Sequence, residues 1–352
     1  MALISKKKLI YPINEKLHFY LKKYNRVSPI HIHYTDLLRY TNSIPLYDKN
    51  DEDTLWITVF YNHEDMFHIH ESLKKIYANL KADGHMDIMS HLYIDRIDLC
   101  TYGNTKPFRV RIVNQFNDNF DYFYVKQADA SRVYGLELED LLSPNKVSYM
   151  VHEQTLIEEH IAGIPGDQFI ATKIGDSTLN KTRLIKEFVK FNERCFIRLL
   201  GDMHTSNFVV VEVPDFDDVS YRLRAIDFDQ QSYEGKRSVY LPQYFKQNNP
   251  FVELGIGRIT PQTLKQYQIE ERSMVGHRIM ASHYILNDLI DTMKSDRIAP
   301  RENVFQLRNA LYRYYKDSLF LKCDNMGEIL EESLHHLLRV LNIGKTNFVL
   351  KK

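Results

Sequence analysis

Cysteine is scarce in this sequence, and no stretch is apolar enough for a signal peptide or a membrane span. The 352 residues include 3 cysteines, Cys100, Cys195 and Cys323, which are far apart and without paired spacing. This pattern disfavours a disulfide framework and a zinc site. The lysines near the N-terminus are not followed by an apolar run of signal-peptide length. We therefore expect a soluble protein in the reducing cytoplasm.

The sequence also lacks a net charge. Its 46 Lys and Arg residues balance 46 Asp and Glu residues. No overall field attracts nucleic acid or an anionic membrane, so neither is expected as a partner. No internal repeat or low-complexity tract is present, and a hydrophobic fraction of 44% is enough for ordinary cores. The length fits one large domain or two of medium size.

A polar loop and an acidic segment are the most informative parts of the chain. Residues 201–208 read Gly-Asp-Met-His-Thr-Ser-Asn-Phe, and residues 225–229 read Ala-Ile-Asp-Phe-Asp. One loop could use Asp202 to present a carboxylate to a substrate hydroxyl and Asn207 to present an amide oxygen to a metal ion. Asp227 could then hold the metal against the phosphates of a nucleotide. Together the two segments predict a phosphoryl-transfer site.

The elements expected around these segments favour the same interpretation. Apolar residues recur at helical spacing from Leu184 to Leu199, which predicts a helix that leads directly into the loop. Two β-prone runs, 208–213 and 221–226, flank a connector that begins with Pro214, and they predict a hairpin between the loop and the acidic segment. The order helix, polar loop, hairpin, acidic loop is that of a kinase-like catalytic lobe.

Upstream, the sequence pattern predicts an antiparallel meander. Strands are expected at 94–101, 108–116 and 121–127, joined by turn-forming connectors. Lys126 lies near the end of the third strand. It is either a solvent-facing residue of a half-buried sheet or a lysine that grips phosphate in a nucleotide-binding lobe.

A phosphate-gripping lysine needs an acidic partner. A helix is expected over Val147–Ile161, and Glu153 lies on the margin of its apolar stripe. Glu158 and Glu159 are rival partners, and all three could instead be solvated charges. Beyond this segment, a strand is expected at 168–174.

The remaining expectations concern both ends of the chain. In the first 90 residues, helices are expected at 17–24 and 72–80 and a strand at 54–61. Several histidines of this region could bind a metal or could be ordinary polar residues; they are His31, His33, His63, His68 and His70. Three later segments have the apolar spacing of helices, namely 263–294, 304–321 and 327–341.

The loop and the acidic segment resemble the catalytic loop and metal-binding segment of the aminoglycoside and choline phosphotransferase branch of the protein-kinase-like superfamily. They are also similar to a group of uncharacterised bacterial proteins assigned to that fold. The resemblance implies an α+β, bilobal, kinase-like fold with a small antiparallel β N-lobe and a larger helical C-lobe. Residues 1–90 would be an N-terminal α/β extension, 91–175 the nucleotide-binding N-lobe and 176–352 the helical catalytic C-lobe.

The same resemblance implies a role for each residue of the site. Asp202 would orient and deprotonate the acceptor hydroxyl, and His204 would brace the loop. Asn207 and Asp227 would bind Mg²⁺. Lys126, paired with Glu153, would hold the α- and β-phosphates of ATP.

The sequence departs from the family pattern at three places. Between residues 102 and 126 the only glycine is Gly103, so the usual glycine-rich phosphate loop is absent or replaced by residues 102–105. Asp229 stands where kinases commonly have glycine, and it could be a further metal ligand or could cap the next turn. The segment before the helix at 182 also offers fewer strands than a nucleotide-binding lobe usually has.

The expected function is therefore an ATP- and magnesium-dependent phosphotransferase that acts on a hydroxyl. One alternative is a pseudokinase or scaffold that keeps the fold without catalysis. Another is a metal-dependent phosphohydrolase built from the loop histidine and the carboxylates. The acceptor, a small molecule or a protein, and the oligomeric state are not indicated by the sequence.

Overall fold

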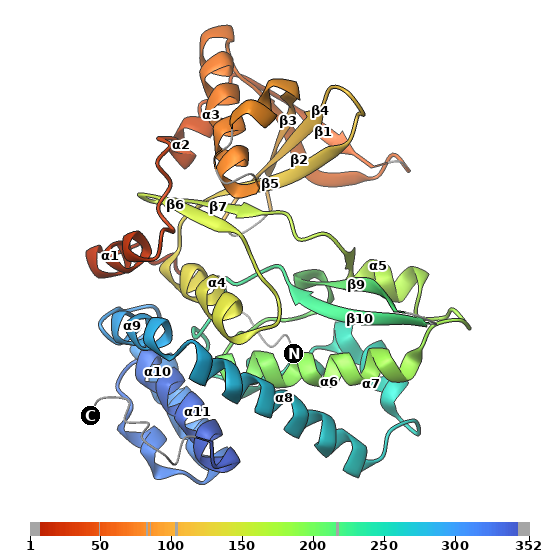
Figure 1. Ribbon diagram of the computed structural model, residues 1–352, viewed down its shortest axis with the longest axis vertical. Coiled ribbons are helices and arrows are strands. Elements are labelled where there is room, and N and C mark those ends of the chain that lie inside the picture. Colours follow the sequence, from red (N-terminus) through yellow and green to blue (C-terminus); the bar gives the residue numbers. More distant parts are fainter. Residues whose placement is uncertain are drawn as a thin grey trace. The chain divides into compact units, whose positions relative to one another are not determined.

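The computed structural model describes residues 8–48, 50–81, 84, 86–102, 105–215 and 218–343. The chain forms two compact units. The sheet unit comprises Lys7–Ala130 and Val147–His160, and the helical unit comprises Ser131–Lys146 and the described residues from Ile161 onward. The fold is α+β, as expected, with a seven-stranded antiparallel sheet and a largely helical C-terminal half (Figure 1).

The sheet unit is built on one sheet whose strands lie in the order β1-β2-β3-β4-β5-β7-β6. Every neighbouring pair is antiparallel. The strands are β1 (Asn42–Tyr47), β2 (Asp53–Phe60), β3 (Leu92–Cys100), β4 (Phe108–Asn114), β5 (Phe120–Gln127), β6 (Tyr149–His152) and β7 (Thr155–Glu159). The helices are α1 (Glu15–Lys23), α2 (Tyr34–Leu37) and α3 (His63–Lys81), with a 3₁₀ turn, η1, at Met86–His91.

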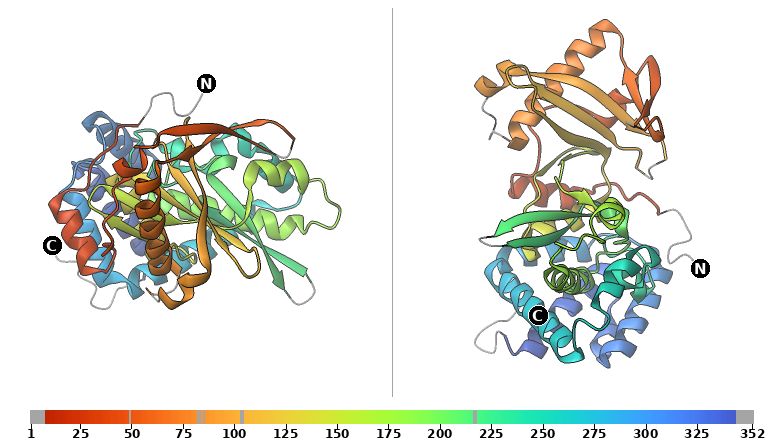
Figure 2. Two further views of the ribbon diagram at one scale, coloured as in Figure 1. Left: turned by 90° about the horizontal axis from the view of Figure 1, so that it is seen from above. Right: turned by 90° about the vertical axis from the view of Figure 1, so that its right-hand side faces the viewer.

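One face of this sheet packs against α3 (Figure 2). The alternation along β4 explains why: Val110 and Ile112 are buried in the core, whereas Arg109 and Arg111, which alternate with them, are partly exposed. Successive side chains of a strand point to opposite faces. On α3, Leu73 and Ile76 are fully buried in the same core.

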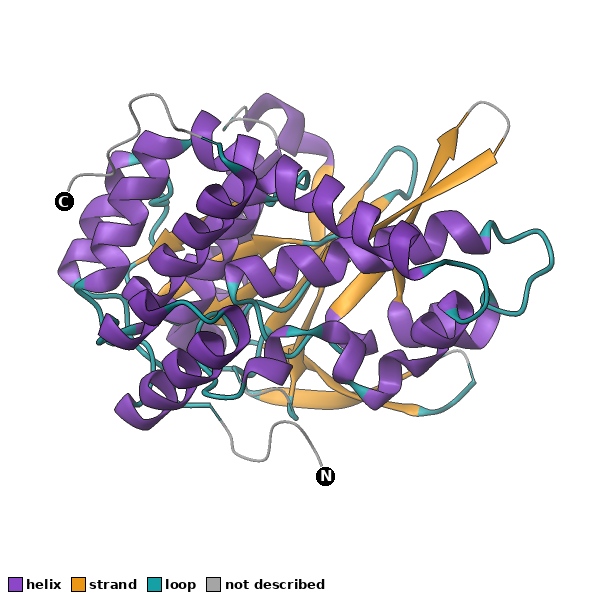
Figure 3. Ribbon diagram, turned by 90° about the horizontal axis from the view of Figure 1, so that it is seen from below, coloured by secondary structure: helices purple, strands orange, loops and turns teal. Residues whose placement is uncertain are grey.

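The helical unit combines a small sheet with eight α-helices and several 3₁₀ turns among its described residues, and helices make up most of it (Figure 3). Its strands lie in the order β10-β9-β8, and they are β8 (Ile164–Pro165), β9 (Phe208–Asp215) and β10 (Asp218–Ala225). Its helices are α4 (Ala130–Leu142), of which all but the first residue belong to this unit, α5 (Gly166–Thr172), α6 (Lys181–Arg198), α7 (Asn249–Gly255), α8 (Pro261–Ala281), α9 (His283–Lys294), α10 (Arg301–Tyr315) and α11 (Met326–Leu341). The turns are η2 (Thr205–Asn207), η3 (Arg237–Tyr240), η4 (Pro242–Tyr244), η5 (Lys246–Asn248) and η6 (Ser318–Lys322).

Helix α6 is the centre of this unit and packs against β10, α7, α8 and α11. It begins at the cap Asn180, whose side chain accepts a hydrogen bond from the Arg183 amide. Leu184, Phe188 and Phe191 form its buried stripe, as the sequence spacing predicts. The helix ends at Leu199, which is left-handed with φ 56°. Among the described residues, no helix is long and apolar enough to cross a membrane.

Two predicted elements are wrong. Val147–Ile161 is not a helix: it holds the hairpin β6–β7, with Glu153 in the turn at φ 49°. Both strands are buried almost throughout, and periodicity cannot distinguish a continuous buried run from a buried helix. The segment 168–174 is not a strand, because most of it lies in α5, which buries only Gly166 and Phe169.

The units also divide the chain differently from the predicted boundaries at residues 90 and 175. Strands β1 and β2 precede residue 90 but belong to the same sheet as β3, because Ile57 of β2 pairs with Leu99 of β3. The first 90 residues therefore contribute two strands to the main sheet. The stretch 131–146, predicted as part of the N-lobe, belongs to the helical unit.

Candidate functional site

The predicted loop is held in place by its own backbone. After α6 ends, the Leu200 amide donates to the Cys195 carbonyl over 2.9 Å and the Gly201 amide donates to the Gln230 carbonyl over 3.1 Å. A side chain at Gly201 would clash, since a Cβ there would lie 2.9 Å from a Val239 methyl carbon and 3.1 Å from the Gln230 oxygen. The loop thus lies directly against the segment that follows Asp229.

Asp202 has an unusual backbone conformation. Its φ is 62°, in the left-handed region that non-glycine residues rarely occupy. Its amide donates to the Val239 carbonyl over 3.1 Å, and its own carbonyl accepts from the His204 amide over 2.9 Å. Strained conformations of this kind persist where the surrounding structure fixes them, and they cluster at functional sites.

Asn207 connects the loop to the acidic segment. Its side-chain amide donates to the Asp202 carbonyl over 2.9 Å. Its backbone carbonyl accepts from the Ile226 amide over 3.0 Å, at the residue before Asp227. The hairpin β9–β10 between Asn207 and Ile226, which the sequence predicts, brings the two segments together.

The acidic segment is paired with an arginine that the sequence analysis did not identify. Arg132 of α4, which is 2% exposed, donates through one guanidinium nitrogen to Asp227 over 2.6 Å and to Asp229 over 2.9 Å. A second guanidinium nitrogen donates to the Ile226 carbonyl over 3.3 Å. The Asp229 amide also donates to the Asp227 carboxylate over 3.0 Å. Asp229 therefore shares a cation with Asp227.

Helix α4 approaches this segment closely because of Gly135. A Cβ at that position would lie 2.9 Å from the Cβ of Phe228 and 3.1 Å from that of Gln231. Ser131 adds a hydrogen bond of 2.6 Å to the Gln231 carbonyl. An isolated glycine within a helical pattern was the available signal for such a close contact, but no feature of the sequence indicates which segment α4 contacts.

The carboxylates raise one another's proton affinity. The pKa of Asp202 is raised from 3.8 to about 7, first by burial and then by the negative charges of Asp227, Glu234 and Asp229. Burial also raises the pKa of Glu234. Glu234 is a second residue that sequence reasoning missed, since only the folding of the segment after Asp229 brings it near. A carboxyl group with a pKa near neutrality is suited to taking up a proton.

His204 contacts the loop rather than a cluster of ligands. Its ring accepts a hydrogen bond of 3.4 Å from the Ser206 amide, at the start of η2. Its Nε2 lies 3.9 Å from an Asp202 carboxylate oxygen. Burial lowers the pKa of His204, which favours the neutral imidazole. These contacts are those of a side chain that holds the loop.

Lys126 lies on β5 in the sheet unit and is 8% exposed. Its ammonium group pairs with the Glu158 carboxylate over 2.8 Å. The register explains this pair: Lys126 lies opposite Leu156, and Glu158 is two residues farther along β7 on the same face. The expected partner was Glu153, and that expectation is wrong, because Glu153 is in the hairpin turn with 66% of its side chain exposed. Gly103 lies outside the described residues.

The five histidines of the first 90 residues that could bind a metal fall into two groups. His63, His68 and His70 are on α3. His31 and His33 lie near His152 of β6, with 3.4 Å between the facing ring nitrogens of His31 and His152. Within the described part of the chain, no three or more His, Cys, Asp or Glu side chains are placed to hold a metal ion. Asp202, Asp227 and Asp229 therefore do not form such a group, and the last two pair with Arg132.

Comparison with models of known protein families finds none that matches this chain, and comparison with curated proteins finds no match either.

Proposed function

We propose that the chain is an ATP- and magnesium-dependent phosphotransferase of kinase-like, bilobal fold that transfers a phosphoryl group to a hydroxyl. The observation that carries the proposal is Asp202. Its carboxyl group is partly buried and has a pKa of about 7. Its backbone is in the left-handed region, and its backbone carbonyl accepts a hydrogen bond from the Asn207 side chain. The motif around it resembles that of the aminoglycoside and choline phosphotransferases.

In this reaction Asp202 accepts the proton of the acceptor hydroxyl. As that oxygen forms its bond to the γ-phosphorus of ATP, the bond between the γ-phosphorus and the leaving ADP oxygen breaks. Proton transfer by a positioned carboxylate is typically worth about 10² to 10⁴ in rate. The fixed backbone of the loop supports this role because positioning provides much of the catalysis in phosphoryl transfer.

The oxygen atoms of Asp227 and Asn207 have the chemistry that Mg²⁺ prefers. Mg²⁺ bound by them would supply the charge that offsets the phosphate oxygens. Asp229 is less suited to this role, since only 14% of its side chain is exposed, against 36% for Asp227. In the sheet unit, the buried pair Lys126–Glu158 supplies a positioned ammonium group of the kind that holds α- and β-phosphates.

A second candidate function is a scaffold of the same fold that does not catalyse transfer. One observation favours it: the guanidinium of Arg132 is already paired with the carboxylates of both Asp227 and Asp229. A phosphohydrolase that used His204 as a metal ligand has less support, because the Nδ1 of that ring accepts a hydrogen bond from the loop backbone.

Titration of the full chain with ATP in the presence and absence of Mg²⁺ separates these functions. A ligand that binds only the folded state raises stability by RT ln(1 + [L]/Kd). The proposal predicts a rise in Tm that needs both ATP and Mg²⁺, together with conversion of ATP to ADP. A rise in Tm without turnover, or no rise at millimolar ATP, contradicts the phosphotransferase and favours the scaffold.

A further inference from the structure

The helical unit contains a cavity of about 370 Å³ that is separate from the candidate site. Its walls come from α6, η4, α7, the connector 256–260 and the N-terminal part of α8 as far as Gln268. Pockets for small molecules usually measure about 300 to 1,000 Å³ and are mainly apolar. The volume is therefore at the lower end of the range for a bound small molecule.

The base of the cavity is rigid and its rim is apolar. Phe188 and Phe251 stack at the base with ring centroids 5.2 Å apart, and both are buried. At the rim, Ile256 is 72% exposed, next to Gly257 at φ 75°, and Leu264 is 36% exposed. Large apolar side chains exposed around a concave surface commonly mark a binding site.

The polar groups of the cavity are neutral. None of the side chains that line it is charged, so an ion that entered would lose its hydration without meeting an opposite charge. Asn192, which is 5% exposed, uses its amide to fix the wall: its oxygen accepts from the Gln243 amide over 2.8 Å, and its nitrogen donates to the Phe188 carbonyl over 2.7 Å. Gln268 and Gln243 contribute further amide groups to the lining.

The wall of this cavity is continuous with the candidate active loop. The ring of Phe251 packs edge-on against Phe208, the residue after Asn207, with centroids 5.8 Å apart. Asn248 donates to the carbonyl of Met203 over 2.8 Å and to that of Pro242, beside Gln243, over 2.7 Å. A molecule in the cavity would therefore contact Phe251, which packs against the loop, and Gln243, which follows a residue bonded to Asn248.

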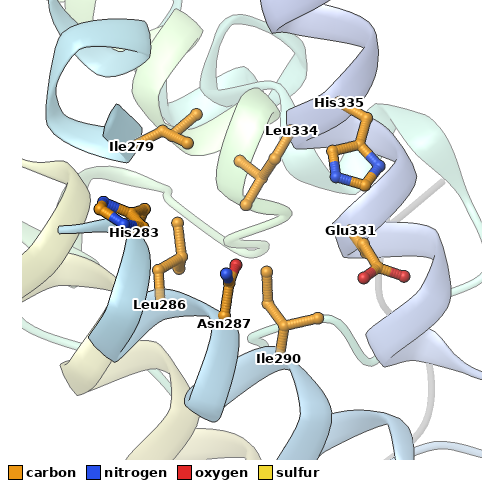
Figure 4. Close-up of a pocket in the computed structure, with 8 residues that line it drawn as sticks. All are labelled: Ile279, His283, Leu286, Asn287, Ile290, Glu331, Leu334 and His335. Atoms are coloured by element: carbon orange, nitrogen blue, oxygen red, sulfur yellow. The ribbon is translucent and has the colours of Figure 1, made fainter. Parts of the chain in front are cut away.

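A second cavity in the same unit is too small for an organic ligand. It lies between α8, α9 and α11 and measures about 10 Å³ (Figure 4). This is room for one water molecule at most. Unlike the larger cavity, it has titratable side chains around it, namely His283, Glu331 and His335.

We propose that the cavity between α6, α7 and α8 binds a neutral, mainly apolar molecule that carries one hydrogen-bonding group. The volume selects a small molecule, the aromatic base and apolar rim select an apolar body, and the amide lining selects one polar group. The absence of charge in the lining selects against acids and amines. This inference does not depend on the proposed phosphotransferase activity.

The test uses the full chain and two fluorescent probes that share an arylamine body. N-phenyl-1-naphthylamine is neutral, whereas 8-anilino-1-naphthalenesulfonate carries a negative charge. The proposal predicts saturable binding of the neutral probe, at least about tenfold tighter than that of the charged probe. Equal binding of the two probes, or no binding of the neutral one, overturns it.

Variants locate the binding. Val189 of α6 lines the cavity and is partly buried, so Val189→Trp should fill it, weaken the neutral probe at least about tenfold and raise Tm by removing an unfilled space. Val340→Trp is the matched control, because Val340 is 57% exposed on α11 and does not line the cavity. Ile256→Ser changes only the exposed rim and should also weaken the neutral probe. Binding that persists unchanged in both Val189→Trp and Ile256→Ser contradicts the proposal.

Discussion

Arg132 and Asp227 form a hydrogen-bonded ion pair of 2.6 Å although they are 95 positions apart in the chain. The arginine is almost completely buried, whereas 36% of the aspartate side chain is exposed. The same guanidinium nitrogen reaches Asp229, which is 14% exposed. A cation bound at Asp227 would therefore share the carboxylate with Arg132.

Arg132→Gln should make the protein less stable and more dependent on Mg²⁺. Removal of a buried guanidinium leaves two carboxylates without their cation, and breaking a buried pair costs about 3 to 5 kcal/mol, less here because Asp227 is partly exposed. Urea unfolding with and without Mg²⁺ measures this effect. Mg²⁺ should restore more stability to the variant than to the wild type.

The control for this variant is Arg183→Gln. Arg183 pairs with Asp215, and both side chains are well exposed, at 40% and 51%. Exposed pairs contribute about 0 to 1 kcal/mol, so this variant should unfold nearly as the wild type does. An Arg132→Gln variant that is equally unaffected, or that gains nothing extra from Mg²⁺, contradicts the role given to Arg132.

Asp202→Asn should become more stable than the wild type as the pH rises. The pKa of Asp202 is 3.8 in the unfolded chain and about 7 in the folded protein. Because the folded state binds the proton more tightly, the contribution of Asp202 to stability falls between pH about 4 and about 7 and then stays constant. Asparagine has no such dependence. Free energies of unfolding measured at several pH values should diverge over this interval, and parallel curves contradict the raised pKa.

Glu234→Gln should lower the pKa of Asp202, the proposed catalytic base. The charge of Glu234 is one of the causes that raise the pKa of Asp202. The proposed reaction needs Asp202 unprotonated, so kcat/KM should rise through pH about 7 in the wild type, and at lower pH in the variant. Glu253→Gln, an exposed position on α7, should leave the profile unchanged. A profile that does not move in Glu234→Gln, or that moves equally in both variants, counts against this account.

Glu158→Gln and Glu153→Gln should differ in stability. Glu158 holds the buried ammonium group of Lys126, and the side chains are only 6% and 9% exposed. Breaking such a pair costs about 3 to 5 kcal/mol. Glu153 is exposed in the hairpin turn, so its substitution should change the free energy of unfolding by less than about 0.5 kcal/mol. Equal effects of the two substitutions in urea unfolding contradict the assignment of the partner.

The sequence predicted elements whose pattern is local. The meander β3–β4–β5, the helix α6 and the hairpin β9–β10 each have a clear period and clear turn residues. The hairpin β6–β7 was not predicted because both of its faces are buried, so its sequence lacks the alternation of apolar and polar residues that marks a strand.

The candidate site was predictable only where it is local in the chain. Asp202, Asn207 and Asp227 stand in recognisable segments around one hairpin. Arg132 and Glu234 were not found, because only tertiary packing brings α4 and the segment after Asp229 to those carboxylates. The partner of Lys126 depends on the register between β5 and β7, and a shift of one residue would place a different side chain beside the lysine.

The most direct measurement is Mg²⁺-dependent turnover of ATP by the full chain and by Asp202→Asn, with sugars and amino alcohols supplied as hydroxyl acceptors, followed by phosphorus NMR. The account predicts that the wild type converts ATP to ADP only when Mg²⁺ is present. It also predicts that Asp202→Asn is slower by at least about a hundredfold while its Tm still rises with ATP and Mg²⁺. Equal turnover by the two proteins, or ATP binding without any turnover by the wild type, contradicts the central claim.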